Sequence, residues 1–197
     1  AYFHNCVGGY HGAKLQRYQE MIDYHIQPEM QSIMNTLNKK NTGAGVDSVL
    51  QKLEALNMLN TKYIIYNKQS APLVNQHALG NAWFVGNYEL VPDAEAEINA
   101  LDQFSPSQTA IVDKDFGDNL ESQSFQKDTA GKIELFHYEP NHLKYNYRAD
   151  SKQLTVFSEV YYPEGWTLYV DGQPTDMFRA NYILRAAVLP EGEHTVE

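Results

Sequence analysis

The alternation of apolar and polar positions predicts mixed helix and strand in the first half of the chain. Helical spacing over residues 13–27 places Leu15 and Tyr18 on one face and predicts an amphipathic helix. Pro28 follows it as a boundary signal, because proline cannot donate a backbone hydrogen bond. A second helix is expected after Asp47, whose carboxylate is suited to an N-cap.

Strands alternate with a helix in the next part of the chain. Residues 62–67, 82–91 and 109–113 are rich in β-branched and aromatic side chains, which favour strands. Asp93 is expected to cap a short acidic helix that ends near Gln103. The order of strand, helix and strand predicts a small α/β unit.

The pattern changes to short strands after a polar, aperiodic stretch over residues 114–131. Leu143, Tyr145 and Tyr147 alternate with polar residues, as a strand with one buried face requires. Six strands are expected, at 133–138, 143–149, 154–161, 166–170, 182–189 and from 194 onward. Asp171-Gly172 is a hairpin signal between two of them. Such short strands separated by turns are typical of an antiparallel β-sandwich.

The predicted fold class is therefore α+β, with two domains joined by a linker. Residues 1–118 form the small α/β unit, residues 119–131 the linker, and residues 132–197 the β-sandwich. The last strand is cut by the end of the sequence, and the chain opens on Ala1 without a methionine. We expect the natural polypeptide to continue beyond Glu197.

Charge and composition exclude some classes of partner. Lys and Arg number 15 against 25 Asp and Glu, and the net charge of −10 repels phosphate backbones, so no nucleic acid partner is expected. The single cysteine, Cys6, excludes an intramolecular disulfide. No apolar run approaches the roughly 20 residues that a membrane helix needs.

The densest glycine cluster lies directly before the first predicted helix. It reads Gly8-Gly9-Tyr10-His11-Gly12, and a phosphate could lie at such a helix N-terminus. No lysine followed by serine or threonine completes a phosphate-binding loop, so a tight turn is the favoured interpretation. Tyr10 and His11 are the ligand-binding candidates in this half of the chain.

Metal and catalytic chemistry have weak support in the sequence. His137, Glu139 and His142 flank a turn and come nearest to a metal site, but a solvated turn is favoured and no metal or cofactor is predicted. No Gly-x-Ser-x-Gly motif is present, and Cys6 has no assignable base. Carboxylate pairs suited to a hydrolase, interpreted instead as surface charge, are Asp113 with Asp115 and Glu95 with Glu97. No catalytic residue is assigned.

Aromatic and polar residues on the predicted strands supply the remaining binding candidates. Trp83 and Trp166 could stack on sugar rings, although aromatic residues on strands pack mostly in cores. Arg179, Asn181 and Tyr182 could form a polar interface at one edge of the sandwich. A carbohydrate-binding module is accordingly one alternative function, and a free-standing cell-envelope hydrolase is another.

Four stretches of the sequence, taken together and in order, resemble the C-terminal soluble region of YfhO-type bacterial membrane proteins. The resemblance spans nearly the whole chain, and each stretch alone would be a weak signal. The stretches are Gly8-Gly9-Tyr10-His11-Gly12-Ala13-Lys14-Leu15, Leu56-Asn57-Met58-Leu59-Asn60-Thr61-Lys62-Tyr63, residues 158–166 leading into 169–172, and residues 179–186 followed by 190–196, of which the first begins Arg179-Ala180-Asn181-Tyr182.

The resemblance implies a polytopic protein that looks like a membrane glycosyltransferase using lipid-linked sugars. In enzymes of that class the catalytic carboxylate belongs to a loop near the first membrane helices, which this sequence does not include. We therefore expect a non-catalytic accessory domain on the extracytoplasmic face of the cytoplasmic membrane, periplasmic in a Gram-negative cell. It would cover the membrane active site or position the acceptor glycan. Its expected partners are the transmembrane part of the same polypeptide and a cell-envelope glycan.

Overall fold

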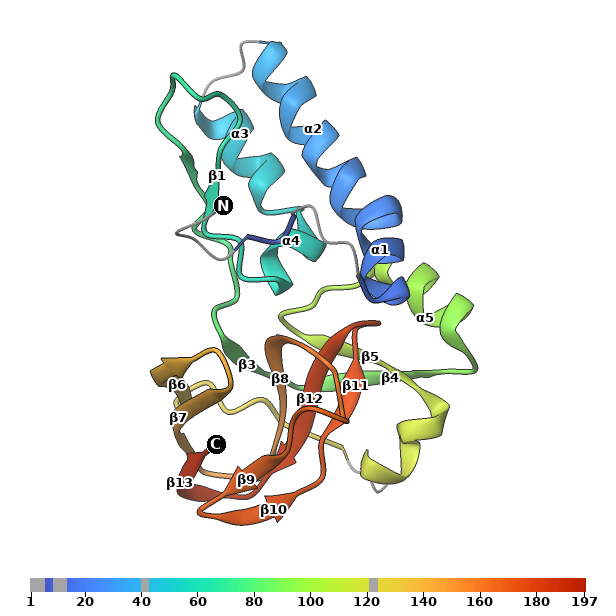
Figure 1. The fold of residues 1–197 in the computed structure, drawn as a ribbon, viewed down its shortest axis with the longest axis vertical. Helices are drawn as coiled ribbons and strands as arrows, with labels where there is room; N and C mark the ends of the chain where they lie inside the picture. The colour runs from blue at the N-terminus through green and yellow to red at the C-terminus, as the bar shows by residue number, and fades with distance from the viewer. Residues whose placement is uncertain (1–5, 9–13, 40–42, 121–123) are drawn as a thin grey trace. The chain divides into compact units, whose positions relative to one another are not determined.

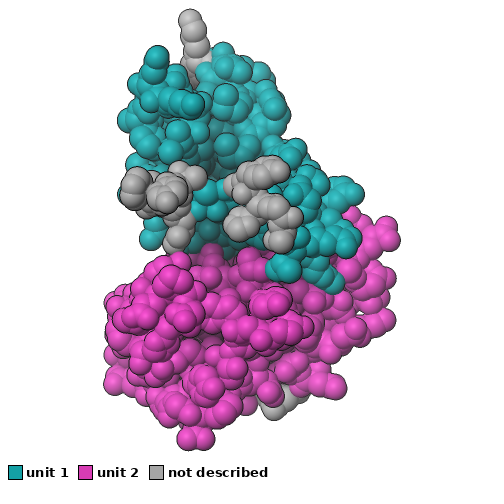
Figure 2. Space-filling model, viewed as in Figure 1, with its two compact units in different colours: residues 1–79 teal, residues 80–197 magenta. Residues whose placement is uncertain are grey.

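The computed structural model describes residues 6–8, 14–39, 43–120 and 124–197, and it confirms the α+β class (Figure 1). The chain divides into two compact units, Ala1–Leu79 and Gly80–Glu197, which Figure 2 shows in different colours. Helices dominate the described part of the first unit, and antiparallel strands dominate the second. No helix of the described residues has the length and apolar character needed to cross a membrane.

The first unit begins with three helical segments that follow one another without a break. They are α1 (Gln16–Met21), the π-helix η1 (Ile22–Ile26) and α2 (Gln27–Asn38). Pro28 lies in the first turn of α2. It cannot donate a hydrogen bond to the preceding turn, and its ring would clash with a carbonyl group of a regular α-helical turn there. A π-helical turn directly precedes this position and allows the chain to stay helical. The expected boundary at Pro28 is thus a change of helix type, and the helix continues to Asn38.

Two further helices and a small hairpin complete the described part of this unit. The helices are α3 (Gly43–Leu50) and α4 (Glu54–Met58), and the antiparallel strands are β1 (Tyr63–Ile64) and β2 (Leu73–Val74). The predicted N-cap at Asp47 is wrong, because α3 has already begun at Gly43. Asp47 instead lies within α3, and its Oδ1 is 3.0 Å from Nε2 of His77.

Glu29 joins α2 to the start of α4 inside the first unit. Its two carboxylate oxygens accept hydrogen bonds from the backbone N–H groups of Ala55 and Leu56, at 2.8 and 2.9 Å. A distant side chain therefore satisfies N–H groups in the first turn of α4, where Leu53 at the N-cap makes no side-chain hydrogen bond. Burial raises the pKa of Glu29 to about 7, although these hydrogen bonds act in the opposite direction.

The second unit contains a parallel strand pair with a helix between its strands. The strands are β4 (Asn87–Val91) and β5 (Thr109–Asp113), and the helix is α5 (Ala94–Ala100), continued by the 3-10 turn η2 (Leu101–Gln103). The predicted cap at Asp93 is confirmed, since its Oδ1 accepts the N–H of Ala96 at 2.9 Å. A second 3-10 segment, η3 (Lys114–Leu120), follows β5.

Two antiparallel sheets form the sandwich of the second unit. One has the order β10-β9-β13-β7-β6, and the other β11-β12-β8-β3. The strands are β3 (Ala82–Val85), β6 (Lys132–Glu139), β7 (His142–Ala149), β8 (Gln153–Val160), β9 (Leu168–Val170), β10 (Gln173–Thr175), β11 (Phe178–Ala180), β12 (Leu184–Leu189) and β13 (Gly192–Val196). Aromatic rings from the two sheets meet edge to face in one core, with centroids 5.7 Å apart for Phe84 and Tyr147 and 5.4 Å for Tyr145 and Phe157.

The division between the units falls at Leu79 and Gly80 and not at the predicted linker 119–131. Strand β3 pairs with β8, with Ala82 opposite Phe157, so that this strand of the predicted first domain belongs to the sandwich. Described residues within the predicted linker are also packed: Phe125 is buried, and Gln153 Oε1 accepts the backbone N–H of Asp128. A polar, aperiodic composition therefore does not mark a domain boundary here.

Candidate functional site

The predicted polar residues after β11 form a turn that is buried within the second unit. Asn181 and Tyr182 both have left-handed backbones, with φ of 49° and 71°. The backbone N–H of Asn181 donates to the carbonyl of Ile111 at 2.7 Å, and its side-chain Oδ1 accepts the N–H of Ile111 at 2.9 Å. Asn181 thus forms hydrogen bonds with both the N–H and the carbonyl group of Ile111 on β5, as a neighbouring strand would.

Arg179 lies between two buried carboxylates. One of its terminal nitrogens is 3.3 Å from Glu97 Oε2 and 3.4 Å from Asp113 Oδ2, and its guanidinium carbon is 5.0 Å from the ring centroid of Phe116. The side chains of Glu97 and Asp113 are 0% and 9% exposed, and that of Arg179 is 15% exposed. Glu97 also accepts the backbone N–H of Tyr182 at 3.1 Å.

This arrangement corrects the prediction that Arg179, Asn181 and Tyr182 form an interface at the edge of the sandwich. Buried charges must be paired, and the carboxylates on α5 and β5 require the guanidinium inside the unit. Two of the carboxylates considered for a hydrolase, Glu97 and Asp113, are held in the same ion-pair network. We call these five residues the buried polar network.

The two tryptophans considered for stacking on sugar rings are buried or partly buried. Trp83 is 7% exposed, and its indole N–H donates to the carbonyl of Pro106 at 2.7 Å. Trp166 is partly buried against the sandwich core, and the guanidinium of Arg185 lies 4.0 Å from its ring centroid. One face of Trp166 is thus already covered by a cation–π contact. Tyr10 and His11, the other predicted ligand-binding residues, lie outside the described residues.

The outer face of the five-stranded sheet carries a row of polar and aromatic side chains that crosses four neighbouring chain segments. Lys144 faces outward, since Leu143 and Tyr145 on either side of it are buried, and His137 is its partner on β6. Glu197 Oε2 lies 3.3 Å from Lys144 Nζ, and the backbone of Glu197 exchanges two 2.8 Å hydrogen bonds with that of Tyr169. We call His137, Lys144, Glu197 and Tyr169 the outer-face row.

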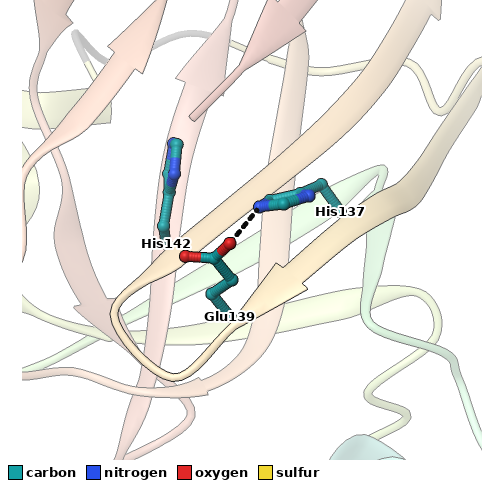
Figure 3. Close-up of side chains that lie close together, drawn as sticks. All are labelled: His137, Glu139 and His142. Carbon is teal, nitrogen blue, oxygen red and sulfur yellow. Dashed lines mark ion pairs between the residues drawn. The ribbon is translucent and has the colours of Figure 1, made fainter.

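A group of potential metal ligands lies at one end of this row, at the turn between β6 and β7 (Figure 3). His137 Nε2 is 3.3 Å from Glu139 Oε1, and the rings of His137 and His142 have centroids 5.5 Å apart. One ligand atom from each of the three residues lies within 4.8 Å of the others. His142 Nε2 is also 3.1 Å from Glu197 Oε2. The sequence named the three turn residues, but the alternation pattern alone did not reveal Lys144, Glu197 or Tyr169 as their neighbours.

An ion pair between His194 and Asp171 lies at the hairpin between β9 and β10. Asp171 and Gly172 both have positive φ, as the Asp-Gly signal predicts for a two-residue hairpin loop. His194 Nδ1 is 2.6 Å from Asp171 Oδ2, and Nε2 is 2.8 Å from the carbonyl oxygen of Glu191. Because both ring nitrogens face acceptors, the protonated ring is favoured and the pKa of His194 is raised, first through the hydrogen bond to Asp171. The same bond lowers the pKa of Asp171.

The His194→Gln substitution is expected to cost more stability at about pH 5 than at about pH 9. The raised pKa of His194 means that its contribution is fully present below the ordinary value of 6.5 and is lost as the pH rises through the folded-state pKa. The lowered pKa of Asp171 means that its contribution is lost only in acid. Urea unfolding of the wild type and His194→Gln across this pH range measures the difference. An Asp171→Asn background should abolish most of its pH dependence, and a difference that is constant with pH in the wild-type background would refute the assignment.

Comparison with known proteins finds no relative of this chain. No protein-family model, no curated protein and no solved structure matches the chain. The resemblance to YfhO-type proteins therefore stays a prediction from the sequence motifs. The function is interpreted from that prediction together with the contacts described above.

Proposed function

We propose that the chain is an extracytoplasmic accessory domain of a polytopic bacterial membrane protein that resembles glycosyltransferases using lipid-linked sugars. The transmembrane part of the same polypeptide is its partner and supplies the catalytic groups. The domain positions the acceptor glycan near the membrane active site and catalyses no transfer by itself. One observation carries this proposal. In one of the four stretches that resemble YfhO-type proteins, the polar side chains contact other groups inside the unit.

That motif is the segment that begins at Arg179 and contains Asn181. The guanidinium of Arg179 pairs with Glu97 and Asp113, and the amide oxygen of Asn181 accepts from Ile111. A catalytic acid or base has to reach the proton that it transfers, whereas these groups face one another inside the unit. Their contacts support a role for the motif in building a rigid scaffold, which is what a positioning domain requires.

The outer-face row supports contact with a glycan over simple covering of the membrane active site. Tyr169 is 38% exposed, and its strand neighbour Glu197 is paired with Lys144. A tyrosine ring offers an apolar face with a polar tip, and adjacent charged groups can donate to and accept from sugar hydroxyls. This combination of one aromatic surface with a few polar groups is typical of sites that fix the orientation of a ligand.

The test uses the intact membrane protein and glycan transfer to its acceptor. Tyr169→Ala is expected to raise the KM for the acceptor about tenfold, the equivalent of roughly 1.4 kcal/mol of binding, with kcat unchanged. Tyr63→Ala is the matched control, because Tyr63 is exposed in the first unit and should leave KM unchanged. An unchanged KM in Tyr169→Ala, or transfer catalysed by the 197-residue chain alone, would count against the proposal.

The outer-face row also favours a second candidate, a carbohydrate-binding module that acts without a membrane partner. The two functions differ in the affinity of the isolated chain for glycans. Saturable binding of cell-envelope glycans by the isolated chain, lost in Tyr169→Ala, would support the module. Calorimetric titration that shows no heat in the isolated chain, together with the KM effect in the intact protein, would support the accessory domain.

A further inference from the structure

We propose that His137, Glu139 and His142 form a binding site for a zinc ion at the turn between β6 and β7. The site extends beyond the proposed function and does not depend on it. It is built from one hairpin: the two residues of β6 lie two positions apart, and Glu139 is the strand partner of His142 (Figure 3). The carboxylate of Glu139 is therefore held between two imidazole-bearing side chains.

The spacing of the ligand atoms is close to that around a bound zinc ion. Zinc lies about 2.0–2.2 Å from nitrogen and oxygen ligands, so two ligands of a tetrahedral site are separated by roughly 3.4 Å. The distance from His137 Nε2 to Glu139 Oε1 is 3.3 Å, which already matches one edge of such a tetrahedron. The largest separation among the three ligand atoms stays within 4.8 Å. All three side chains are substantially exposed, so small rotations can close the remaining edges.

A bulge in β6 places His137 on the same face as the other ligands. Leu135 lies opposite Tyr145, and His137 lies opposite Lys144, so one extra residue, Phe136, is accommodated between them. In a regular register His137 would lie opposite Leu143, whose side chain is buried in the sandwich. The bulge redirects the imidazole outward and leaves Phe136 55% exposed. Bulges of this kind occur often beside functional sites, where they redirect a side chain.

The donor set selects the class of metal. Two imidazoles and one carboxylate suit zinc, which binds three protein ligands and keeps a fourth position open for water or a substrate group. Calcium and magnesium prefer sites built from oxygen ligands alone, so neither suits two imidazoles. The donor set therefore fits zinc and not calcium or magnesium.

Two neighbouring charges tune the site. Glu197 Oε2 lies 3.1 Å from His142 Nε2, and a carboxylate that accepts from this nitrogen orients the ring so that the other nitrogen, Nδ1, can bind the metal. Lys144 Nζ lies 3.3 Å from the same carboxylate oxygen and brings a positive charge close to the ion. Removal of the lysine charge should therefore strengthen metal binding, whereas loss of a ligand should weaken it.

Calorimetric titration of zinc chloride into the full 197-residue chain, freed of metal, tests the site. The wild type is expected to bind one zinc ion at this site, His142→Gln and Glu139→Gln to bind it at least tenfold more weakly, and Lys144→Met about threefold more tightly. His77→Gln, which changes a partly exposed histidine of the first unit, is the matched control and should bind as the wild type does. Magnesium chloride should give no binding heat.

Circular dichroism of each variant checks that it is folded. A wild type that binds no zinc would overturn the proposal. Zinc binding of undiminished affinity in both His142→Gln and Glu139→Gln would overturn it as well, because the ion would then be held by other residues. Neither result bears on the acceptor KM of Tyr169→Ala, so the failure of this site and of the proposed function can be told apart.

Discussion

Replacement of Arg179 by methionine is expected to lower the free energy of unfolding by about 3–5 kcal/mol. The substitution keeps most of the apolar stem but removes the guanidinium that pairs with both Glu97 and Asp113. The two carboxylates would then stay buried without the guanidinium that pairs with them, which is far more costly than the loss of a surface ion pair. Urea unfolding followed by circular dichroism measures the change.

Arg148→Met provides the matched control for this prediction. Arg148 and Glu193 form an ion pair at 3.8 Å, but their side chains are 67% and 80% exposed. Surface pairs contribute roughly 0–1 kcal/mol, so this variant should unfold almost as the wild type does. Equal losses of unfolding free energy in Arg179→Met and Arg148→Met would contradict the claim that burial makes the Arg179 ion pairs stabilising.

Replacement of Asn181 by alanine is expected to cost about 2–4 kcal/mol of stability. The backbone N–H of Ile111 would lose its acceptor inside the unit, and an unsatisfied buried donor costs about 1–3 kcal/mol. Alanine would also have to adopt a backbone with φ of 49°, which asparagine tolerates better than most residues. The midpoint and slope of urea unfolding give the change.

Asn181→Gly separates the two contributions. Glycine removes the same hydrogen bond but adopts positive φ freely, so this variant should be about 1 kcal/mol more stable than Asn181→Ala. Asn146→Ala, at an exposed position of β7, is the surface control and should stay within about 0.5 kcal/mol of the wild type. A glycine variant as unstable as the alanine variant would mean that the left-handed backbone carries no cost.

The sequence predicted those elements of the fold that depend on neighbouring residues. The alternation from Leu143 to Tyr147 predicted β7 because one face of that strand is buried. Asp93 predicted the start of α5, since an N-cap acts within its own turn. Asp171-Gly172 predicted a hairpin because its conformation is set locally. In each case the physical cause and the sequence signal lie within a few residues of each other.

Features that depend on distant partners were not predictable in the same way. Strand β3 pairs with β8, and the predicted boundary failed because alternation shows which face of a strand is buried but not which strand lies beside it. The role of Glu29 in capping α4 was missed, since its N–H partners lie 26 and 27 residues away. Arg179 was recognised as notable, but its carboxylate partners are 66 and 82 residues away.

The candidate site shows the same division. The spacing of His137, Glu139 and His142 across one turn was readable, because a hairpin brings its two ends together. The bulge at Phe136 and the approach of Glu197, which follows β13, depend on strand pairing, and neither could be read from spacing alone. The pattern favoured the core for Trp83 but did not show its hydrogen bond to the carbonyl of Pro106, which accompanies its burial.

Labelling of Cys6 in intact cells tests the central claim, an extracytoplasmic domain attached to a membrane protein, most directly. The thiol of Cys6 is exposed, so a membrane-impermeant maleimide can reach it wherever the domain faces outward. The intact gene product is expected in the membrane fraction, with Cys6 labelled before lysis and no label at this position in Cys6→Ser. A gene product in the soluble cytosolic fraction, with Cys6 labelled only after lysis, would contradict the account.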